Sequence, residues 1–167
     1  MHIRIEEKQD WPAIRAVNES AFETSAEANL VEALREQAAP LVSLVAVDEA
    51  SVVGHILFSP VTLSRHPELR VMGLAPMAVT RQHQSQGVGS LLVRAGLDEC
   101  SKLGFGAVVV LGHPRYYPRF GFAPAARYGI VCEYEVPEDA FMVVELQPGY
   151  LRRASGTIRY HTAFASL

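Results

Sequence analysis

The sequence predicts an α/β fold in which one mixed sheet is covered by helices, and three observations support this prediction. Short runs rich in valine, leucine and isoleucine have the length and composition of strands. Other segments repeat apolar residues every three or four positions, as helices with one buried face do. Turns marked by glycine and proline separate the two kinds of segment. The expected order of elements is β-α-α-β-β-β-α-β-α-β-β.

This order contains four helices, of which the last would follow the strand at 107–111, and the first three have their own start or stop signals. Asp10 as an acidic cap and Pro12 mark the first helix, which continues through Phe22. Ser25 caps the second helix, which ends before Pro40. The third follows a glycine-containing turn and ends at Gly104, and its expected buried positions are Val88, Leu91, Leu92, Ala95 and Leu103.

The apolar runs place the strands. We expect them at residues 2–5, 41–47, 52–63, 71–80, 107–111, 128–136 and 141–146. Two hairpin-like turns are expected, at 48–51 and at 137–139. Residues 147–167 are expected to form an irregular cover or one more short strand.

Composition limits the class of protein. The chain has 167 residues, 49% of them hydrophobic and 20% charged, so we expect a single domain over residues 1–167. A net charge of −3 with scattered basic residues argues against nucleic acid or a membrane surface as partner. No apolar stretch of membrane-spanning length occurs, and a charged segment follows Met1 directly. The expected location is the cytoplasm.

Three residues with reactive side chains are interpreted as structural. Cys100 and Cys132 show no CxxC spacing and no neighbouring metal ligands, so we expect neither a disulfide nor a metal site. His55 is a lone histidine on a predicted strand, where packing is the commoner role.

The most informative stretch is 79–92, which joins a strand to the third helix through a polar turn containing Gly87 and Gly89. A helix N-terminus offers unpaired N–H groups and a partial positive charge, and it therefore binds phosphates. The two glycines remove Cβ atoms that would hold a phosphate away, and Arg81 and His83 add positive charge. The pattern Q-x-x-G-x-G thus predicts a pyrophosphate cradle. A tight turn that needs glycine only for its backbone is the alternative.

A second informative stretch follows the buried strand at 107–111. Residues 112–122 contain two tyrosines, two arginines and a histidine. Such a composition directly after a buried strand indicates that something polar binds there.

The order of elements, the Q-x-x-G-x-G motif that begins at Gln84 and the Y-x-x-x-G-F motif that begins at Tyr117 together resemble the GNAT superfamily of N-acetyltransferases. Segments 54–61, 113–122 and 141–146 are similar to its YhbS-like branch, so the resemblance covers nearly the whole chain. It implies a single-domain α/β (α+β) fold. The central sheet would be mixed, mostly antiparallel and splayed at the middle, with helices on both faces.

The resemblance also implies acetyl-CoA as cofactor. It would lie between the strand that ends at Val79 and the strand that ends at Leu111, with its pyrophosphate on backbone N–H groups and its pantetheine arm along the first strand. The residues implied for cofactor binding are Met77, Ala78, Val79, Gln84, Ser85, Gln86, Gly87, Val88, Gly89 and Ser90.

The chemistry implied by the resemblance is direct transfer, in which a neutral amine attacks the thioester and a backbone N–H near Val79 stabilises the oxyanion. Tyr117 would protonate the departing sulfur. With reference pKa values of about 10 for tyrosine and about 8.5 for a thiol, complete transfer is uphill by roughly 2 kcal/mol. We therefore interpret Tyr117 as a hydrogen-bond donor whose proton moves late. An aromatic residue that only fills space is the alternative.

The general base departs from the family pattern. The strand before the cradle has no carboxylate, and Gly112 and His113 stand where many members have asparagine. By family geometry Glu27 and Glu23 are the candidates, with His113 next, because an amine of pKa about 10.4 must lose a proton. With Glu19, these carboxylates also hint at a cationic acceptor.

The predicted function is acetyl-CoA-dependent N-acetylation of a small-molecule or protein amine, and a homodimer is compatible with it. One alternative is a non-catalytic acyl-CoA binding or sensing domain that kept the cradle and lost the base. Another is an adaptor that uses residues 147–167 as an interface.

Overall fold

The computed structural model describes residues 1–167, and the chain forms two compact units. The first unit consists of Met1–Ser59, Ala75–Glu99 and Thr162–Leu167. The second consists of Pro60–Leu74 and Cys100–His161. Strands β3 (Ser51–Leu63) and β4 (Val71–Val79) run from one unit into the other.

Antiparallel strands form the sheet of the first unit. Strand β1 (His2–Ile5) pairs antiparallel with β2 (Val42–Asp48), and β2 pairs antiparallel with β3. Between β2 and β3, Glu49 and Ala50 both have positive φ, at 48° and 66°. Two such residues make the tight turn whose twist suits a hairpin. The predicted hairpin at 48–51 is therefore confirmed.

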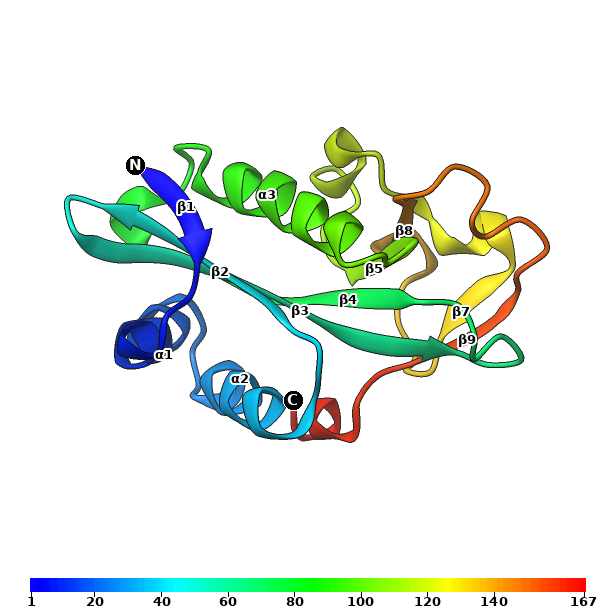
Figure 1. The fold of residues 1–167 in the computed structure, drawn as a ribbon, viewed down its shortest axis with the longest axis horizontal. Coiled ribbons are helices and arrows are strands. Elements are labelled where there is room, and N and C mark those ends of the chain that lie inside the picture. Colours follow the sequence, from blue (N-terminus) through cyan, green and yellow to red (C-terminus); the bar gives the residue numbers. More distant parts are fainter. The chain divides into compact units, whose positions relative to one another are not determined.

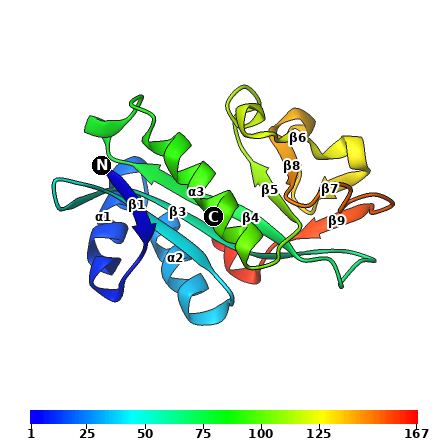
Figure 2. The same cartoon turned by 45° about the horizontal axis from the view of Figure 1, so that its top comes forward.

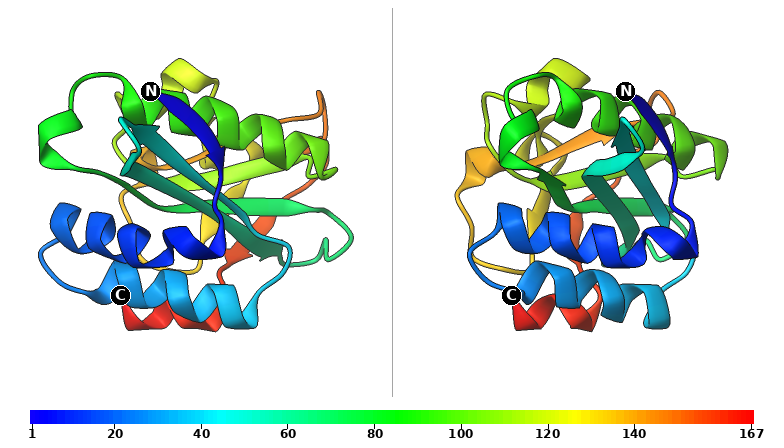
Figure 3. Two further views of the ribbon diagram at one scale, coloured as in Figure 1. Left: turned by 60° about the vertical axis from the view of Figure 1, so that its left-hand side comes forward. Right: turned by 90° about the vertical axis from the view of Figure 1, so that its left-hand side faces the viewer.

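Helices cover both faces of this sheet, as Figures 1 and 3 show. Helices α1 (Trp11–Ala21) and α2 (Ala26–Gln37) lie on one face, and α3 (Val88–Lys102) lies on the other. Contacts of β3 agree with this arrangement, because His55 faces Asn18 of α1 whereas Phe58 faces Gly96 of α3. A strand directs residues of odd and even number to opposite faces.

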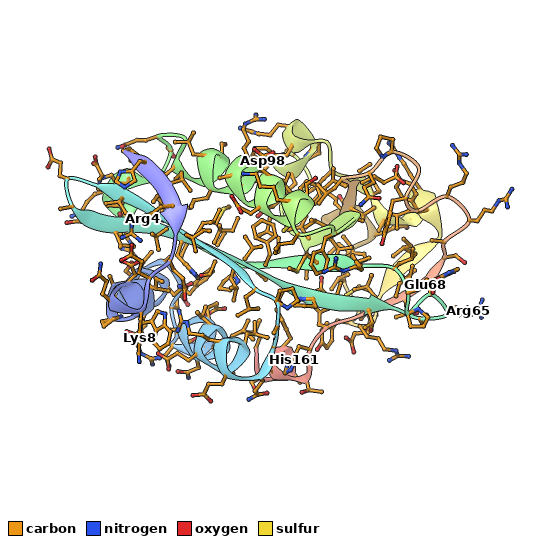
Figure 4. The ribbon with its side chains drawn as sticks, viewed as in Figure 1. Arg4, Lys8, Arg65, Glu68, Asp98 and His161 are labelled. Atoms are coloured by element: carbon orange, nitrogen blue, oxygen red, sulfur yellow. The ribbon has the colours of Figure 1, made fainter.

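The buried stripe of α3 differs from the predicted one. Leu91 and Leu103 are 48% and 43% exposed, so their predicted burial is wrong. Asp98 also lies on an exposed side of the helix (Figure 4). The buried stripe repeats every four residues, at Val88, Leu92, Gly96 and Cys100. A Cβ atom at Gly96 would lie 2.1 Å from Cε1 of Phe58, so glycine lets α3 approach β3 closely.

The helix starts and the N-cap residues Asp10 and Ser25 were predicted correctly, but neither side chain makes the expected cap hydrogen bond. The Asp10 carboxylate accepts hydrogen bonds from Nη1 and Nη2 of Arg4 at 2.7 and 2.9 Å, and it makes no cap bond to α1. Arg4 belongs to β1 (Figure 4). A bidentate ion pair makes two charge-assisted hydrogen bonds, whereas a cap would make one. Ser25 makes no cap bond either, and Thr24 Oγ1 accepts from the N–H of Ala26 at 3.2 Å instead.

The second unit contains both parallel and antiparallel strand pairs, and Figure 2 shows its strands. The first part of β4 pairs parallel with β5 (Ala107–Leu111), and β5 pairs antiparallel with β8 (Phe141–Glu145), which also pairs antiparallel with β6 (Ala123–Pro124). The end of β3 pairs antiparallel with β9 (Gly156–Arg159), and β9 pairs parallel with β7 (Ile130–Cys132). The predicted mixed, mostly antiparallel sheet is confirmed.

Two predicted elements of this unit are wrong. The strand expected at 128–136 is reduced to β7, and it pairs with β9 instead of forming a hairpin with β8. A 3₁₀ turn at Ala125–Tyr128 and the left-handed Gly129, with φ of 70°, occupy the start of the expected strand. The helix expected after β5 is only a short 3₁₀ helix, η3 (Tyr117–Phe120).

Buried apolar side chains fill each unit. In the second unit they form one cluster around Val109, Phe141 and Ile158, to which the C-terminal residues Leu151 and Ala154 contribute. Cys100 is fully buried, as predicted, whereas Cys132 is only partly buried. No helix combines the length and the apolar composition that a membrane span requires.

Candidate functional site

The predicted cradle is a turn between β4 and α3 in the first unit. The N–H of Thr80 donates to the carbonyl of Val53 at 2.9 Å and fixes the end of β4. The 3₁₀ helix η2 (Arg81–His83) follows. Ser85 and Gly87 then adopt left-handed backbone conformations with φ of 63° and 85°. These two residues reverse the chain into α3.

The backbone at Gly87 is open. A Cβ atom there would meet nothing within 4 Å, so the space beside this residue is free of protein side chains. The N–H of Leu91 donates to the carbonyl of Gly87 at 3.1 Å, which begins the helical ladder. The N–H groups of Val88 and Gly89 therefore precede the first intrahelical bond. This geometry fits a diphosphate.

Two glutamine side chains form hydrogen bonds to the backbone of the turn. Nε2 of Gln84 donates to the carbonyl of Val79 at 3.0 Å, and Nε2 of Gln86 donates to the carbonyl of Gln82 at 3.0 Å. Both side chains thus bind the turn itself. An anion bound at the turn would therefore meet main-chain N–H groups.

The end of β4 carries the other implied cofactor residues. Its pairing with β5 covers Val71 to Leu74, and the strand continues to Val79. Pro76 lies in this continuation and has no N–H to donate to a neighbouring strand. Ala78 is buried, whereas Met77 and Val79 are half-buried.

Tyr117 lies in the second unit, in an aromatic cluster. Its ring centroid is 5.1 Å from that of Tyr116 and 5.6 Å from that of Phe122, with edge-to-face geometry in both pairs. A Cβ atom at Gly112 would lie 2.3 Å from Cε2 of Tyr117, so only glycine leaves room for the ring. Burial, with a smaller effect from Tyr116, raises the pKa of Tyr117 to about 12. The phenol therefore keeps its proton.

Glu27 lies in the first turn of α2, on the same face as Val31 and Leu34. Those two side chains are buried, so this face points into the first unit. Atom Oε1 of Glu27 is buried and has no hydrogen-bond partner. An acceptor atom in this state is costly unless a ligand or water satisfies it.

The other base candidates lie on the surface. Glu23 is exposed, and so is Glu19, which was expected only to favour a cationic acceptor and which pairs with Arg15 at 3.3 Å. His113 is exposed too, and its Nδ1 accepts the N–H of Arg115 at 3.2 Å. Among the candidates, Glu27 is the one with a buried, unpartnered oxygen. No group of three or more His, Cys, Asp or Glu residues is arranged to hold a metal ion.

One contact of the cradle was not predicted. His83 binds Thr80 Oγ1 at 2.9 Å through Nδ1 and Asp48 Oδ2 at 3.2 Å through Nε2. Asp48 and His83 are 35 positions apart. No local spacing in the sequence signals such a contact.

Known proteins resemble this chain over nearly its full length. The sequence profile of the acetyltransferase (GNAT) family matches residues 6–122. The N-acetyltransferase YhbS of Escherichia coli is 41% identical over 165 residues, which cover 98% of each chain. A crystal structure of Escherichia coli YhbS in complex with CoA has a TM-score of 0.92 at 39% identity, and the match covers 98% of this chain and 91% of that one.

A second solved structure agrees. The GNAT family acetyltransferase of Brucella melitensis in complex with acetyl-CoA has a TM-score of 0.79 at 34% identity, covering 98% of this chain and 97% of that one. The fold and the family predicted from the sequence are both confirmed. This chain belongs to the acetyltransferase (GNAT) family, and it is an N-acetyltransferase.

Proposed function

We propose that the protein acetylates an amine of a small molecule or a protein with acetyl-CoA, and that residues 1–167 act as one N-acetyltransferase domain. The observation that carries the proposal is the open, left-handed backbone at Gly87 directly before α3. Two similar proteins of solved structure hold CoA and acetyl-CoA. The cytoplasmic location and the homodimer stay predictions.

The turn and the end of β4 would hold the cofactor. Backbone N–H groups from Gln84 to Ser90 would bind the pyrophosphate, because their partial positive charges complement an anion. Main chain at Met77, Ala78 and Val79 would pair with the pantetheine arm. When bound, acetyl-CoA supplies an acetyl group activated as a thioester.

Tyr117 would serve the departing sulfur as a hydrogen-bond donor. Its pKa of about 12 exceeds a thiol's reference value of about 8.5 by roughly 3.5 units, so complete proton transfer costs about 5 kcal/mol. The hydroxyl would therefore stabilise developing negative charge while keeping its proton until late. Because the Tyr117 side chain is buried beside Gly112, water is kept from competing with the sulfur for its hydroxyl group.

Glu27 would take the proton of the acceptor amine. An ammonium group has three N–H donors and a positive charge, both of which complement the unpartnered Oε1 of Glu27. An amine with pKa of about 10.4 is almost wholly protonated at pH 7, so its proton has to leave before the neutral amine attacks the thioester, and Glu27 would accept that proton.

Steady-state release of CoA against a panel of amines tests the chemistry. We expect Tyr117→Phe and Glu27→Gln to lower kcat by about a hundredfold to ten-thousandfold, the usual range for general acid or base catalysis. The KM for acetyl-CoA should stay within about twofold in both variants, because the cradle is unchanged. A wild-type protein that binds CoA and acetylates no amine would favour the sensing domain instead.

Gly87→Ala tests the cradle itself. The change forces φ of 85° on a residue with a Cβ atom, which costs about 1 to 2 kcal/mol or tilts the amides of the turn. We expect CoA to bind at least tenfold more weakly by calorimetry. Gly149→Ala is the matched control, because Gly149 has a similar φ of 76° in the second unit. Equal CoA affinity in the two variants would contradict the proposed cradle.

A further inference from the structure

We infer that Asp48, His83 and Thr80 form a hydrogen-bonded bridge that positions the cofactor turn and thereby sets the affinity for CoA. The inference rests on the proposed function, since it concerns the same turn. It assigns His83 a positioning role that differs from the diffuse positive charge expected from the sequence.

The bridge joins three elements of the first unit. Nδ1 of His83 lies 2.9 Å from Oγ1 of Thr80, and Nε2 lies 3.2 Å from Oδ2 of Asp48. Asp48 ends β2 beside the β2–β3 hairpin, whereas Thr80 follows β4. The imidazole therefore anchors η2 to the β2–β3 hairpin, which comes from another part of the chain.

Both protonation states of His83 preserve the bridge. In the neutral ring with the proton on Nε2, Nε2–H donates to Asp48 and Nδ1 accepts the hydroxyl proton of Thr80. In the charged ring both nitrogens donate, and the hydroxyl of Thr80 turns to accept. The side chains of His83 and Asp48 are 23% and 35% exposed, so water shields the bridge only partly.

The bridge fixes the η2 end of the turn. The carbonyl of Thr80 also accepts the N–H of His83 at 2.9 Å, which closes this short helix. Gln84 follows at once and holds the carbonyl of Val79. With both ends fixed, the amides after Ser85 have one orientation before the cofactor arrives. A turn without the bridge would have to be ordered on binding, and that cost weakens affinity and leaves the chemical step alone.

Calorimetric titration with CoA, together with steady-state kinetics, tests the bridge. We expect His83→Ala and Thr80→Val each to weaken CoA binding by about fivefold to twentyfold, the loss of one or two ordered hydrogen bonds. At saturating acetyl-CoA, kcat should stay within about twofold of wild type. Asp48→Asn keeps an oxygen acceptor for His83 and should bind within about threefold of wild type, whereas Asp48→Ala should match His83→Ala.

A double variant and a control complete the experiment. Asp48→Ala combined with His83→Ala should be no weaker than either single variant, because both remove the same bridge. The control is Gln82, which lies in the same 3₁₀ turn and has an exposed side chain. Gln82→Ala should therefore bind CoA as wild type does.

The outcomes separate the two proposals. A wild-type protein that does not bind CoA overturns the proposed function. A wild-type protein that binds CoA while His83→Ala and Thr80→Val bind it equally well overturns the bridge alone. A fall in kcat as large as the loss of affinity also overturns the positioning role.

Discussion

Nε2 of His55 lies 2.9 Å from Oγ of Ser43, and both ring nitrogens of this fully buried imidazole have partners. Nδ2 of Asn18 lies 3.2 Å from Nδ1 and also donates to a backbone carbonyl, so Nδ1 is the acceptor and Nε2 carries the proton. Ser43 in turn donates to the Glu6 carboxylate. A neutral imidazole satisfies both of its ring nitrogens, and burial lowers the pKa of His55 to about 4.

The protein should lose stability as pH falls from about 6.5 to about 4. The reference pKa of histidine is about 6.5, so in this interval the unfolded chain takes up a proton at His55 that the folded chain refuses. The free energy of unfolding should therefore fall by up to about 1.4 kcal/mol per pH unit, and by about 3 kcal/mol in total. Urea unfolding at pH 7, 6 and 5 measures this slope.

A matched pair of variants isolates the residue. His2→Gln removes an exposed histidine and should keep the slope, whereas His55→Asn should flatten it. The paired carboxylates Glu6 and Asp10, whose pKa values are lowered in the folded protein, titrate below about pH 4.5 and do not account for it. An unfolding free energy that stays constant from pH 7 to pH 5 would contradict the assignment.

Ser85 and Gly87 should respond to substitution with opposite signs. Both residues are left-handed, but only Ser85 carries a Cβ atom and the associated steric penalty of about 1 to 2 kcal/mol. Ser85→Gly should stabilise the protein by up to about 1 kcal/mol, after the entropic cost of glycine is subtracted. Ser85→Val should destabilise it, as Gly87→Ala does. Thermal unfolding of the three variants gives the order, and destabilisation by Ser85→Gly would show that the serine side chain stabilises the turn.

Gly112→Ala should impair catalysis through Tyr117. The added methyl group would lie 2.3 Å from Cε2 of Tyr117, so the ring has to move. We expect kcat to fall by about tenfold with CoA affinity unchanged, because the hydroxyl leaves its position. In a Tyr117→Phe background, Gly112→Ala should lower kcat no further. An additional tenfold loss there would mean that Gly112 acts independently of the phenol.

Local patterns predicted most of the fold, and they are also the basis for the cradle and Tyr117 in the candidate site. The cradle was predictable because Gly87 and Gly89 signal backbone geometry within a few residues, and Tyr117 because its motif follows a buried strand directly. The hairpin at 48–51 is equally local. Each of these features is determined by neighbours along the chain.

Features that depend on distant partners were missed. The side chain of Asp10 was expected to cap α1, but Arg4 of β1 competes for it more strongly. The partner of β7 is β9, which lies more than twenty residues further along the chain, so the predicted hairpin with β8 was wrong. His83 and Asp48 likewise meet only in the folded chain. Sequence spacing carries no information about such competition.

The pH profile of the reaction should show no alkaline decline up to about pH 10. An active tyrosine with the ordinary pKa of about 10 would lose its proton there, but burial raises the pKa of Tyr117 to about 12. Over the same range the acceptor amine loses its proton, so kcat/KM should rise with pH and level off near the amine's own pKa. Profiles from pH 6 to pH 10.5 for wild type and Tyr117→Phe measure this, and the two curves should be parallel. A decline centred near pH 10 in wild type that is absent from Tyr117→Phe would mean that the phenol ionises in the working enzyme. The phenol would then be more accessible to water than the packing of Tyr116 and Phe122 around it indicates.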